Sequence, residues 1–282
     1  MLLEASIGDA YGAGFEFREL DFIHEHNDLT RYFEHGYYSD IYKKYTDDTQ
    51  MAIAISELLL EQSDWNEIRV ADKFVEVFQR DKRNGYSKRV YAALDASING
   101  KELLRNLNNG SNGNGSAMRA YPIGLLNNVE QVLEFAKIQA QVSHNTEEGI
   151  ICAQRIALAA HYYFNKLENS ISLIEFLNET LKVKGDFRVI SPIDMHGYPT
   201  TNAVVKLISH ETSIRNCLKT SIDCGGDTDT VAALCMALLS QKENCSKELP
   251  AFLFDELENA QYGRDFLIDL DSLLIKKFRL HT

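Results

Sequence analysis

The chain has 282 residues, of which 45% are apolar and 25% are charged, and its formal net charge is −12. This composition is typical of a globular protein that is long enough to bury a large core. The negative charge argues against direct binding of nucleic acid, because phosphate contacts need a basic face. It is compatible with a phosphorylated ligand, since bound cations can invert the local charge.

Signals for secretion, membranes and disulfides are weak. The start does not resemble a signal peptide, because Gly8-Asp9 interrupts the apolar pattern early. No apolar run reaches the roughly 18 residues that span a bilayer. The five cysteines are odd in number and lack CxxC spacing, so we expect small core residues rather than disulfides or a zinc site. The default expectation is a cytoplasmic protein without a membrane partner.

The first element is predicted to be a helix that begins almost at Met1. Within it, Gly8-Asp9-Ala10-Tyr11-Gly12 supplies small residues for close packing, and Glu16 follows. Taken alone, Asp9 is explained as a buried carboxylate bonded to backbone amides, and Glu16 as a surface acid. Residues 18–45 are rich in aromatic, histidine and charged residues, and we expect an irregular connection with one short helix.

The next motif is Thr46-Asp47-Asp48-Thr49, which stands just before the apolar run Met51 to Leu60. This order predicts a helix with Thr46 as its N-cap and both carboxylates in the first turn. Helix capping alone would explain such a segment if it occurred once.

A run rich in Gly, Asn and Ser from Asn106 to Arg119 interrupts the helical pattern. In Gly113-Asn114-Gly115-Ser116 the glycines remove side-chain bulk and free backbone N–H groups to point at an anion. A plain turn explains the run equally well. Beside a metal cluster, however, it predicts a diphosphate site.

The second half of the chain is predicted to be helical almost throughout. Apolar stripes at helical spacing run along residues 129–140 and 214–222. The run Ile150 to Phe164 is apolar nearly all round and predicts a buried central helix. Strand signals are sparse, and Phe187 to Ile190 is the best of them. The expected fold is all-α, with ten or more helices in a single domain over residues 1–282.

A second acidic motif, Gly225-Gly226-Asp227-Thr228-Asp229-Thr230, precedes the apolar run Val231 to Leu239, with Thr228 as the expected N-cap. If the two helix N-termini meet, four carboxylates crowd together, which is unfavourable unless protons or cations bind. Hard divalent cations prefer oxygen ligands, and threonine hydroxyls supply neutral ones. The paired motifs therefore predict a two-metal site.

These motifs, in this order and spacing, resemble those of the ADP-ribosylglycohydrolase family. That family includes the enzyme that reactivates dinitrogenase reductase and the eukaryotic ADP-ribosylhydrolases. The resemblance runs from about Met1 to Leu239 and is carried by Gly8-Asp9-Ala10 with Glu16, Thr46-Asp47-Asp48-Thr49, Gly113-Asn114-Gly115 with Ala117-Met118-Arg119, Ser143-His144 and Gly225-Gly226-Asp227-Thr228-Asp229-Thr230.

The resemblance implies an all-α fold, a binuclear magnesium or manganese centre and a set of residue roles. The implied metal ligands are Thr46, Asp47, Asp48, Asp227, Asp229 and Thr230. The implied catalytic residues are Glu16, Asp47 and Asp229, of which Glu16 matches a mobile glutamate beside the scissile bond. The implied substrate-binding residues are Gly110, Ser111, Gly113, Asn114, Gly115 and His144. By itself, His144 is more typical of a structural hydrogen-bonding residue, and Asp9 becomes an acid that orients the ligands.

The implied activity is removal of ADP-ribose from a modified protein, from arginine first and serine second, so the implied partners are ADP-ribosylated protein and ADP-ribose. A catalytically silent ADP-ribose-binding or structural member is the alternative, and a metal-dependent phosphohydrolase is a third interpretation. Some relatives stack adenine on aromatic side chains where this chain has Asn106 and Asn112. We therefore expect either that Tyr86 or Tyr198 holds the adenine instead or that the adenine is held weakly.

Overall fold

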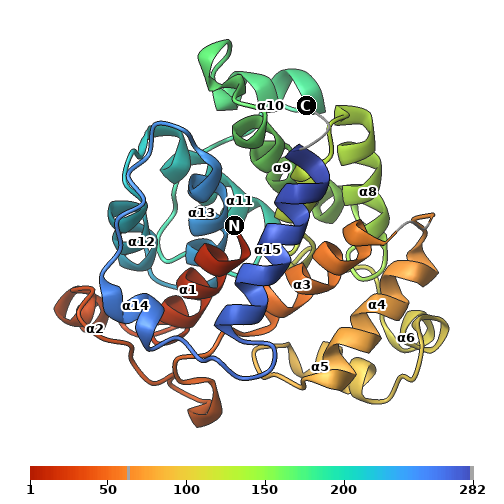
Figure 1. The fold of residues 1–282 in the computed structure, drawn as a ribbon, viewed down its shortest axis with the longest axis horizontal. Helices are drawn as coiled ribbons and strands as arrows, with labels where there is room; N and C mark the ends of the chain where they lie inside the picture. The colour runs from red at the N-terminus through yellow and green to blue at the C-terminus, as the bar shows by residue number, and fades with distance from the viewer. Residues whose placement is uncertain (62–63, 280–282) are drawn as a thin grey trace.

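The computed structural model describes residues 1–61 and 64–279, and within these ranges the regular structure is helical, with isolated β-bridges but no sheet (Figure 1). The α-helices are α1 (Leu2–Ala13), α2 (Leu20–His26), α3 (Asp47–Leu60), α4 (Glu67–Arg80), α5 (Lys88–Asp95), α6 (Gly100–Asn106), α7 (Gly115–Met118), α8 (Val129–Gln141), α9 (Glu147–Phe164), α10 (Leu173–Leu181), α11 (Gly197–His210), α12 (Ile214–Asp223), α13 (Thr228–Gln241), α14 (Ala251–Asp255) and α15 (Arg264–Arg279). Three short 3-10 helices are η1 (Ser39–Ile41), η2 (Tyr121–Leu125) and η3 (Leu167–Asn169). The all-α prediction is confirmed. The predicted domain also includes residues 62–63 and 280–282, which lie outside the described ranges.

The pair α1 and α13 lies side by side near the middle of the molecule (Figure 1). Glycines make this contact close: a Cβ atom at Gly8 would lie 2.6 Å from the carbonyl oxygen of Ala232, and one at Gly12 would lie 2.6 Å from the Cα of Asp229. The small residues of the first motif therefore do what the sequence predicted. They also hold the start of α13, with its acidic motif, against α1.

The predicted central helix is present as α9, which is buried along nearly all of its length. It begins three residues earlier than the apolar run, because the hydroxyl of Thr146 caps it by accepting a hydrogen bond from the N–H of Gly149 at 3.0 Å. Both predicted stripes also face the interior. The buried stripe residues are Val132, Ala136 and Ala140 in α8 and Ile214, Cys217, Leu218 and Ile222 in α12.

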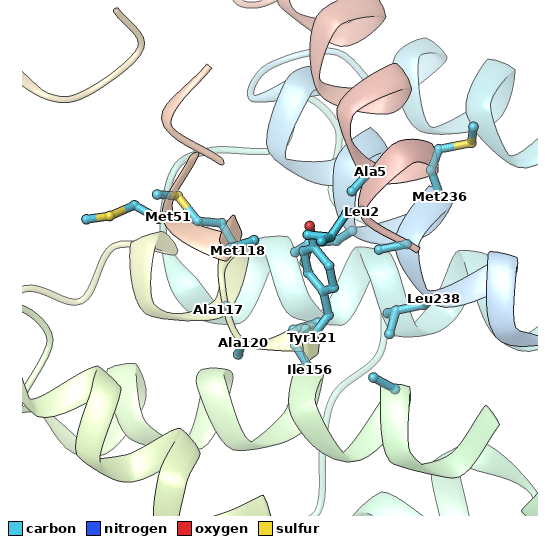
Figure 2. Close-up of a cluster of buried hydrophobic side chains, with 14 of the residues drawn as sticks. Leu2, Ala5, Met51, Ala117, Met118, Ala120, Tyr121, Ile156, Met236 and Leu238 are labelled. Atoms are coloured by element: carbon cyan, nitrogen blue, oxygen red, sulfur yellow. The ribbon is translucent and has the colours of Figure 1, made fainter. Parts of the chain in front are cut away.

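Tyr121 shows how the core joins elements that are distant in sequence. Its ring lies among side chains of α1, α9 and α13, and it points toward Leu2 and Ala5 (Figure 2). Around it are Ile156 of α9 and Leu238 of α13, and all of these side chains are buried. The Tyr121 hydroxyl is enclosed there without a hydrogen-bond partner.

The weak strand signal at Phe187 to Ile190 does not correspond to a strand. Residues 182–190 have no regular structure. Phe187 and Val189 pack on the core from one side, which explains the alternating pattern, but no second extended segment among the described residues pairs with them.

The two irregular stretches were predicted largely correctly. Residues 18–45 contain one short helix, α2, together with the single turn η1. The glycine-rich run is irregular from Leu107 to Asn114 and then forms α7, because the carbonyl of Asn114 accepts hydrogen bonds from the N–H groups of Ala117 and Met118 at 2.7 and 3.0 Å.

All five cysteines are free thiols. Four are buried and Cys224 is half-buried, as expected for core residues.

A membrane-crossing helix would have to be both long and apolar. None of the helices within residues 1–61 and 64–279 meets both conditions.

Candidate active site

The N-termini of α3 and α13 carry the two acidic motifs into one cavity. Helix α3 begins at Asp47 after the N-cap residue Thr46, as predicted. Helix α13 begins at Thr228, so the N-cap residue is Asp227 and the prediction of Thr228 is wrong. The reason is the tight turn at Gly226, whose φ of 83° favours glycine and whose Cβ position is filled by the backbone of Ile193.

The cavity has a volume of about 310 Å³. Its lining includes the predicted catalytic Glu16 and five of the six predicted metal ligands, which are Asp47, Asp48, Asp227, Asp229 and Thr230. The sixth predicted ligand, Thr46, lies outside the lining. Glu16, Asp227 and Asp229 each present a carboxylate oxygen within 4.8 Å of the other two. The structure thus brings together residues that are more than 200 positions apart in the sequence.

Burial and mutual repulsion shape the charge of this cluster. Burial, reinforced by the neighbouring carboxylates, raises the pKa of Asp47, Asp48 and Asp229 well above the ordinary range. Burial and the charge of Glu16 raise the pKa of Asp227 to about 6. One oxygen of Asp48, Oδ1, is buried without any hydrogen-bond partner. A carboxylate group with this orphaned oxygen fits a hard divalent cation.

Asp9 lies behind the first motif and supports it. Its carboxylate accepts hydrogen bonds from the hydroxyls of Thr46 and Thr49 at 2.9 and 2.7 Å, and from both of their N–H groups at 3.0 Å. Burial raises its pKa to about 6, although these hydrogen bonds oppose the shift. Asp9 is therefore a buried carboxylate bonded to backbone amides. Asp9 also fixes the orientation of the predicted ligand Thr46. The Thr46 hydroxyl donates to Asp9 and makes no capping hydrogen bond to helix α3.

Glu16 is not a free surface acid. Its side chain is 19% exposed, and its Oε2 lies 2.7 Å from Nε2 of the buried His35. Sequence reasoning missed His35. The only signal was the abundance of histidine in residues 18–45, because the contact joins two irregular segments whose pairing has no periodic pattern.

The glycine-rich segment forms one wall of the cavity through Ser111, Gly113, Asn114 and Gly115, whereas Gly110 is exposed outside the lining and bridges to His144. The expectation of free backbone donors is wrong at two positions. The N–H of Gly113 donates to Oγ of Ser111 at 3.1 Å, and the N–H of Asn114 donates to the carbonyl of Met195 at 2.9 Å. These amides are satisfied because the segment folds back on itself and onto residue 195.

His144 lines the cavity beside Ser143. The Ser143 hydroxyl accepts from Nη2 of Arg119 at 2.8 Å, and its oxygen also lies 2.8 Å from Nδ1 of His144. When the hydroxyl donates to Nδ1, the proton of the neutral His144 ring is on Nε2. Burial, together with the Arg119 charge, lowers the pKa of His144 to about 3.

The rest of the cavity is largely apolar. Arg119 reaches its wall, with the guanidinium carbon 4.7 Å from the ring centre of Phe74, and burial lowers its pKa to about 9. Of the two tyrosines expected at the adenine, Tyr86 lines the cavity. Tyr198 is outside the lining, with its ring centre 5.4 Å from the Arg155 guanidinium carbon.

Comparison with known proteins places this geometry in a family. A sequence model of the ADP-ribosylglycohydrolase family matches residues 1–281. The ADP-ribosylhydrolase ARH3 of Xenopus tropicalis is 28% identical over 234 residues, which cover 73% of this chain and 62% of that protein. Human ARH3 is 34% identical over 145 residues, covering 49% and 39% respectively. The ADP-ribosylarginine hydrolase Tri1 of Pseudomonas putida is 27% identical over 182 residues, covering 61% and 48%.

The aligned part of the chain therefore spans less than two thirds of the length of these curated relatives. A solved structure described as an ADP-ribosylglycohydrolase-related protein complex superposes with a TM-score of 0.71 at 18% identity, covering 100% of this chain and 96% of that one. That agreement shows the fold. With the match over residues 1–281, it shows that the chain belongs to the ADP-ribosylglycohydrolase family.

Proposed function

We propose that the protein is a metal-dependent hydrolase that releases ADP-ribose from modified protein side chains, with arginine-linked ADP-ribose as the first candidate substrate and serine-linked as the second. The observation that carries the proposal is the convergence of Glu16 with the carboxylates of both acidic motifs on one cavity. A relative named for ADP-ribosylarginine hydrolysis supports the order of the two linkages.

Two divalent cations, magnesium or manganese, are the proposed cofactors. Thr46, Asp47 and Asp48 would hold one, and Asp227, Asp229 and Thr230 would hold the other. The oxygen-only donor set and the unpartnered Oδ1 of Asp48 support hard cations. When bound there, two such cations would supply Lewis-acid chemistry that orients ribose hydroxyls and lowers the pKa of water.

The chain's own groups have separate tasks in this proposal. The Nε2–H of His144 and the hydroxyl of Ser111 are placed to donate to the ribose and diphosphate oxygens. Gly113 leaves room for the ligand, and Gly115 leaves room for the His144 ring, which a Cβ atom there would meet at 2.9 Å. Asn114 acts indirectly, through its bond to Asp227. The negative charges of Asp47 and Asp229 stabilise the oxocarbenium-like transition state of glycosidic cleavage. Glu16 moves a proton at its carboxylate oxygen, and Tyr86 lies at the apolar wall that suits adenine.

The deciding experiment is incubation of the purified protein with arginine-linked and serine-linked ADP-ribosyl peptides, with magnesium or with EDTA. We expect release of free ADP-ribose in magnesium, faster from arginine, and none in EDTA. Release of AMP or phosphate would support the phosphohydrolase interpretation instead. Binding of ADP-ribose without release from either linkage would establish the catalytically silent alternative.

The substitution Glu16→Gln distinguishes the hydrolase hypothesis from the hypothesis of a catalytically silent binder with a single variant. We expect kcat to fall by roughly 10²–10⁴, the contribution of a positioned acid or base. The affinity for ADP-ribose should change little, because the loss is confined to the transition state. Calorimetric titration with ADP-ribose supplies the affinity. If the variant released ADP-ribose at the wild-type rate, we would conclude that a residue other than Glu16 transfers the proton.

A further inference from the structure

Glu16 contacts His35, which belongs to the irregular segment between α2 and α3. The two side chains meet at 2.7 Å, between Nε2 of His35 and Oε2 of Glu16. His35 is almost completely enclosed, with 2% of its side chain exposed. Glu16 therefore has a hydrogen-bond partner in addition to the carboxylates of Asp227 and Asp229 that it faces.

The backbone assigns the tautomer of His35. Its Nδ1 accepts hydrogen bonds from the N–H groups of Tyr37 and Tyr38 at 2.9 and 3.0 Å. An imidazole nitrogen that accepts must be unprotonated, so the ring proton of the neutral tautomer is on Nε2. His35 is thereby set up as the donor and Glu16 as the acceptor.

The two segments that carry this pair are fastened to each other. Arg18 donates through Nη2 to the carbonyl of Glu34 at 3.0 Å. Next to Glu16, Phe17 has a φ of 51°, a strained value for a residue with a side chain, and its N–H donates to the carbonyl of Gly226 at 2.9 Å. The backbone of Glu16 is thus tied to the second acidic motif, and its side chain to His35.

Electrostatics explains why a donor is needed at this point. Glu16 faces two carboxylates, and a cluster of like charges favours any rearrangement that moves one of them away. A donated hydrogen bond to an ionised acceptor offsets that repulsion. We infer that His35 is a positioning residue, which keeps Glu16 beside Asp227 and Asp229 by donating from Nε2 while the loop amides fix its ring. The catalytic part of this inference rests on the proposed hydrolase function.

Two substitutions test the roles of the two ring nitrogens of His35 separately. In His35→Asn, the amide oxygen can still accept from the loop amides, but Glu16 loses its donor. In His35→Gln, the amide nitrogen can reach the Nε2 position and still donate to Glu16. We expect kcat of His35→Asn to fall by roughly 10–100-fold, as for other residues that orient a functional ligand. KM should stay near the wild-type value, and His35→Gln should recover part of the loss. His24→Asn, which removes an exposed histidine of the preceding helix α2, is the matched control.

Combining each variant with Glu16→Gln gives the decisive comparison. If His35 acts through Glu16, His35→Asn should change kcat by less than about twofold in the Glu16→Gln background. An equal loss in both backgrounds, or a wild-type kcat in folded His35→Asn, would overturn the inference. Thermal melting of every variant identifies any loss that comes from unfolding.

A spectroscopic readout keeps the inference separate from the proposed function. Long-range proton–nitrogen spectra of the His35 ring, assigned by the signals lost in His35→Asn, should show a protonated Nε2 and an unprotonated Nδ1. The Nε2 signal should shift in Glu16→Gln. A ring protonated on Nδ1 alone would refute the inference whether or not the protein is active. An inactive wild type with the expected spectrum would instead refute only the proposed hydrolysis.

Discussion

The side-chain amide of Asn114 donates to Oδ2 of Asp227 at 2.5 Å, and it also donates to Oγ1 of Thr200 at 3.0 Å. The glycine-rich segment is thus bonded directly to the second acidic motif. Because Asn114 is buried and committed to these two partners, it positions Asp227 and is not a free donor for a phosphate. A ligand that displaces the segment would therefore also disturb the carboxylate cluster.

Asp229→Asn is predicted to abolish hydrolysis and leave the fold intact. The substitution removes one charge from a buried repulsive cluster, so the metal-free variant should melt at a higher temperature than the metal-free wild type. Magnesium should stabilise the wild type, by about 2.7 kcal/mol at 100 times Kd, and the variant much less. Melting curves in EDTA and in magnesium check both statements. An identical response of the two proteins to magnesium would exclude Asp229 as a ligand.

The stability of the metal-free protein is predicted to decrease as the pH rises through about 6. The pKa of Asp227 is raised to about 6 in the native state, above the value of about 4 for an unfolded chain. The native state therefore binds the extra proton between these values, and the stability that it provides is lost at higher pH. We expect a higher melting temperature in EDTA near pH 5.5 than near pH 7.5. Magnesium should reverse the trend, because it binds the deprotonated carboxylates.

Gly113→Val is predicted to weaken ADP-ribose binding with little effect on metal binding. A side chain at this position would project into the cavity between the glycine-rich segment and His144. Asn109→Val, which alters an exposed residue of the same segment outside the cavity lining, is the control. Calorimetry with ADP-ribose compares the two. Equal affinities in two folded variants would place the nucleotide elsewhere.

Tyr121→Phe is predicted to leave the stability unchanged or to raise it by about 1 kcal/mol, because it removes a buried hydroxyl that has no partner. Tyr11→Phe is the matched comparison. The hydroxyl of Tyr11 donates to Oδ1 of Asn27 at 3.1 Å and accepts from the N–H of Leu29 at 3.2 Å. Its loss should destabilise the protein by about 1–3 kcal/mol. Urea unfolding measures both variants, and a larger loss in Tyr121→Phe would reveal a bond to its hydroxyl.

Local patterns in the sequence were sufficient to predict the all-α fold, the central helix α9 and the helix that starts after Thr46. Apolar periodicity and capping residues act within a few positions, so they can be read without the tertiary structure. They failed where a distant contact decided the outcome. Thr228 is of a residue type that often caps helices, but its hydroxyl donates to the carbonyl of Gly12 at 2.8 Å. Helix α13 therefore begins at Thr228 itself and not at Asp229, as expected if Thr228 were the N-cap residue.

The candidate site divides in the same way. The acidic motifs and the glycine-rich segment stood out because of their unusual residue types, and the predicted aspartates do line one cavity. Their roles as ligands stay predictions. Three contacts could not be predicted: the pairing of His35 with Glu16, the hydrogen bond from Asn114 to Asp227, and the hydrogen bond within the glycine-rich segment. Each depends on which irregular segments pack together, and that packing is determined by the whole core and leaves no periodic signal in the chain.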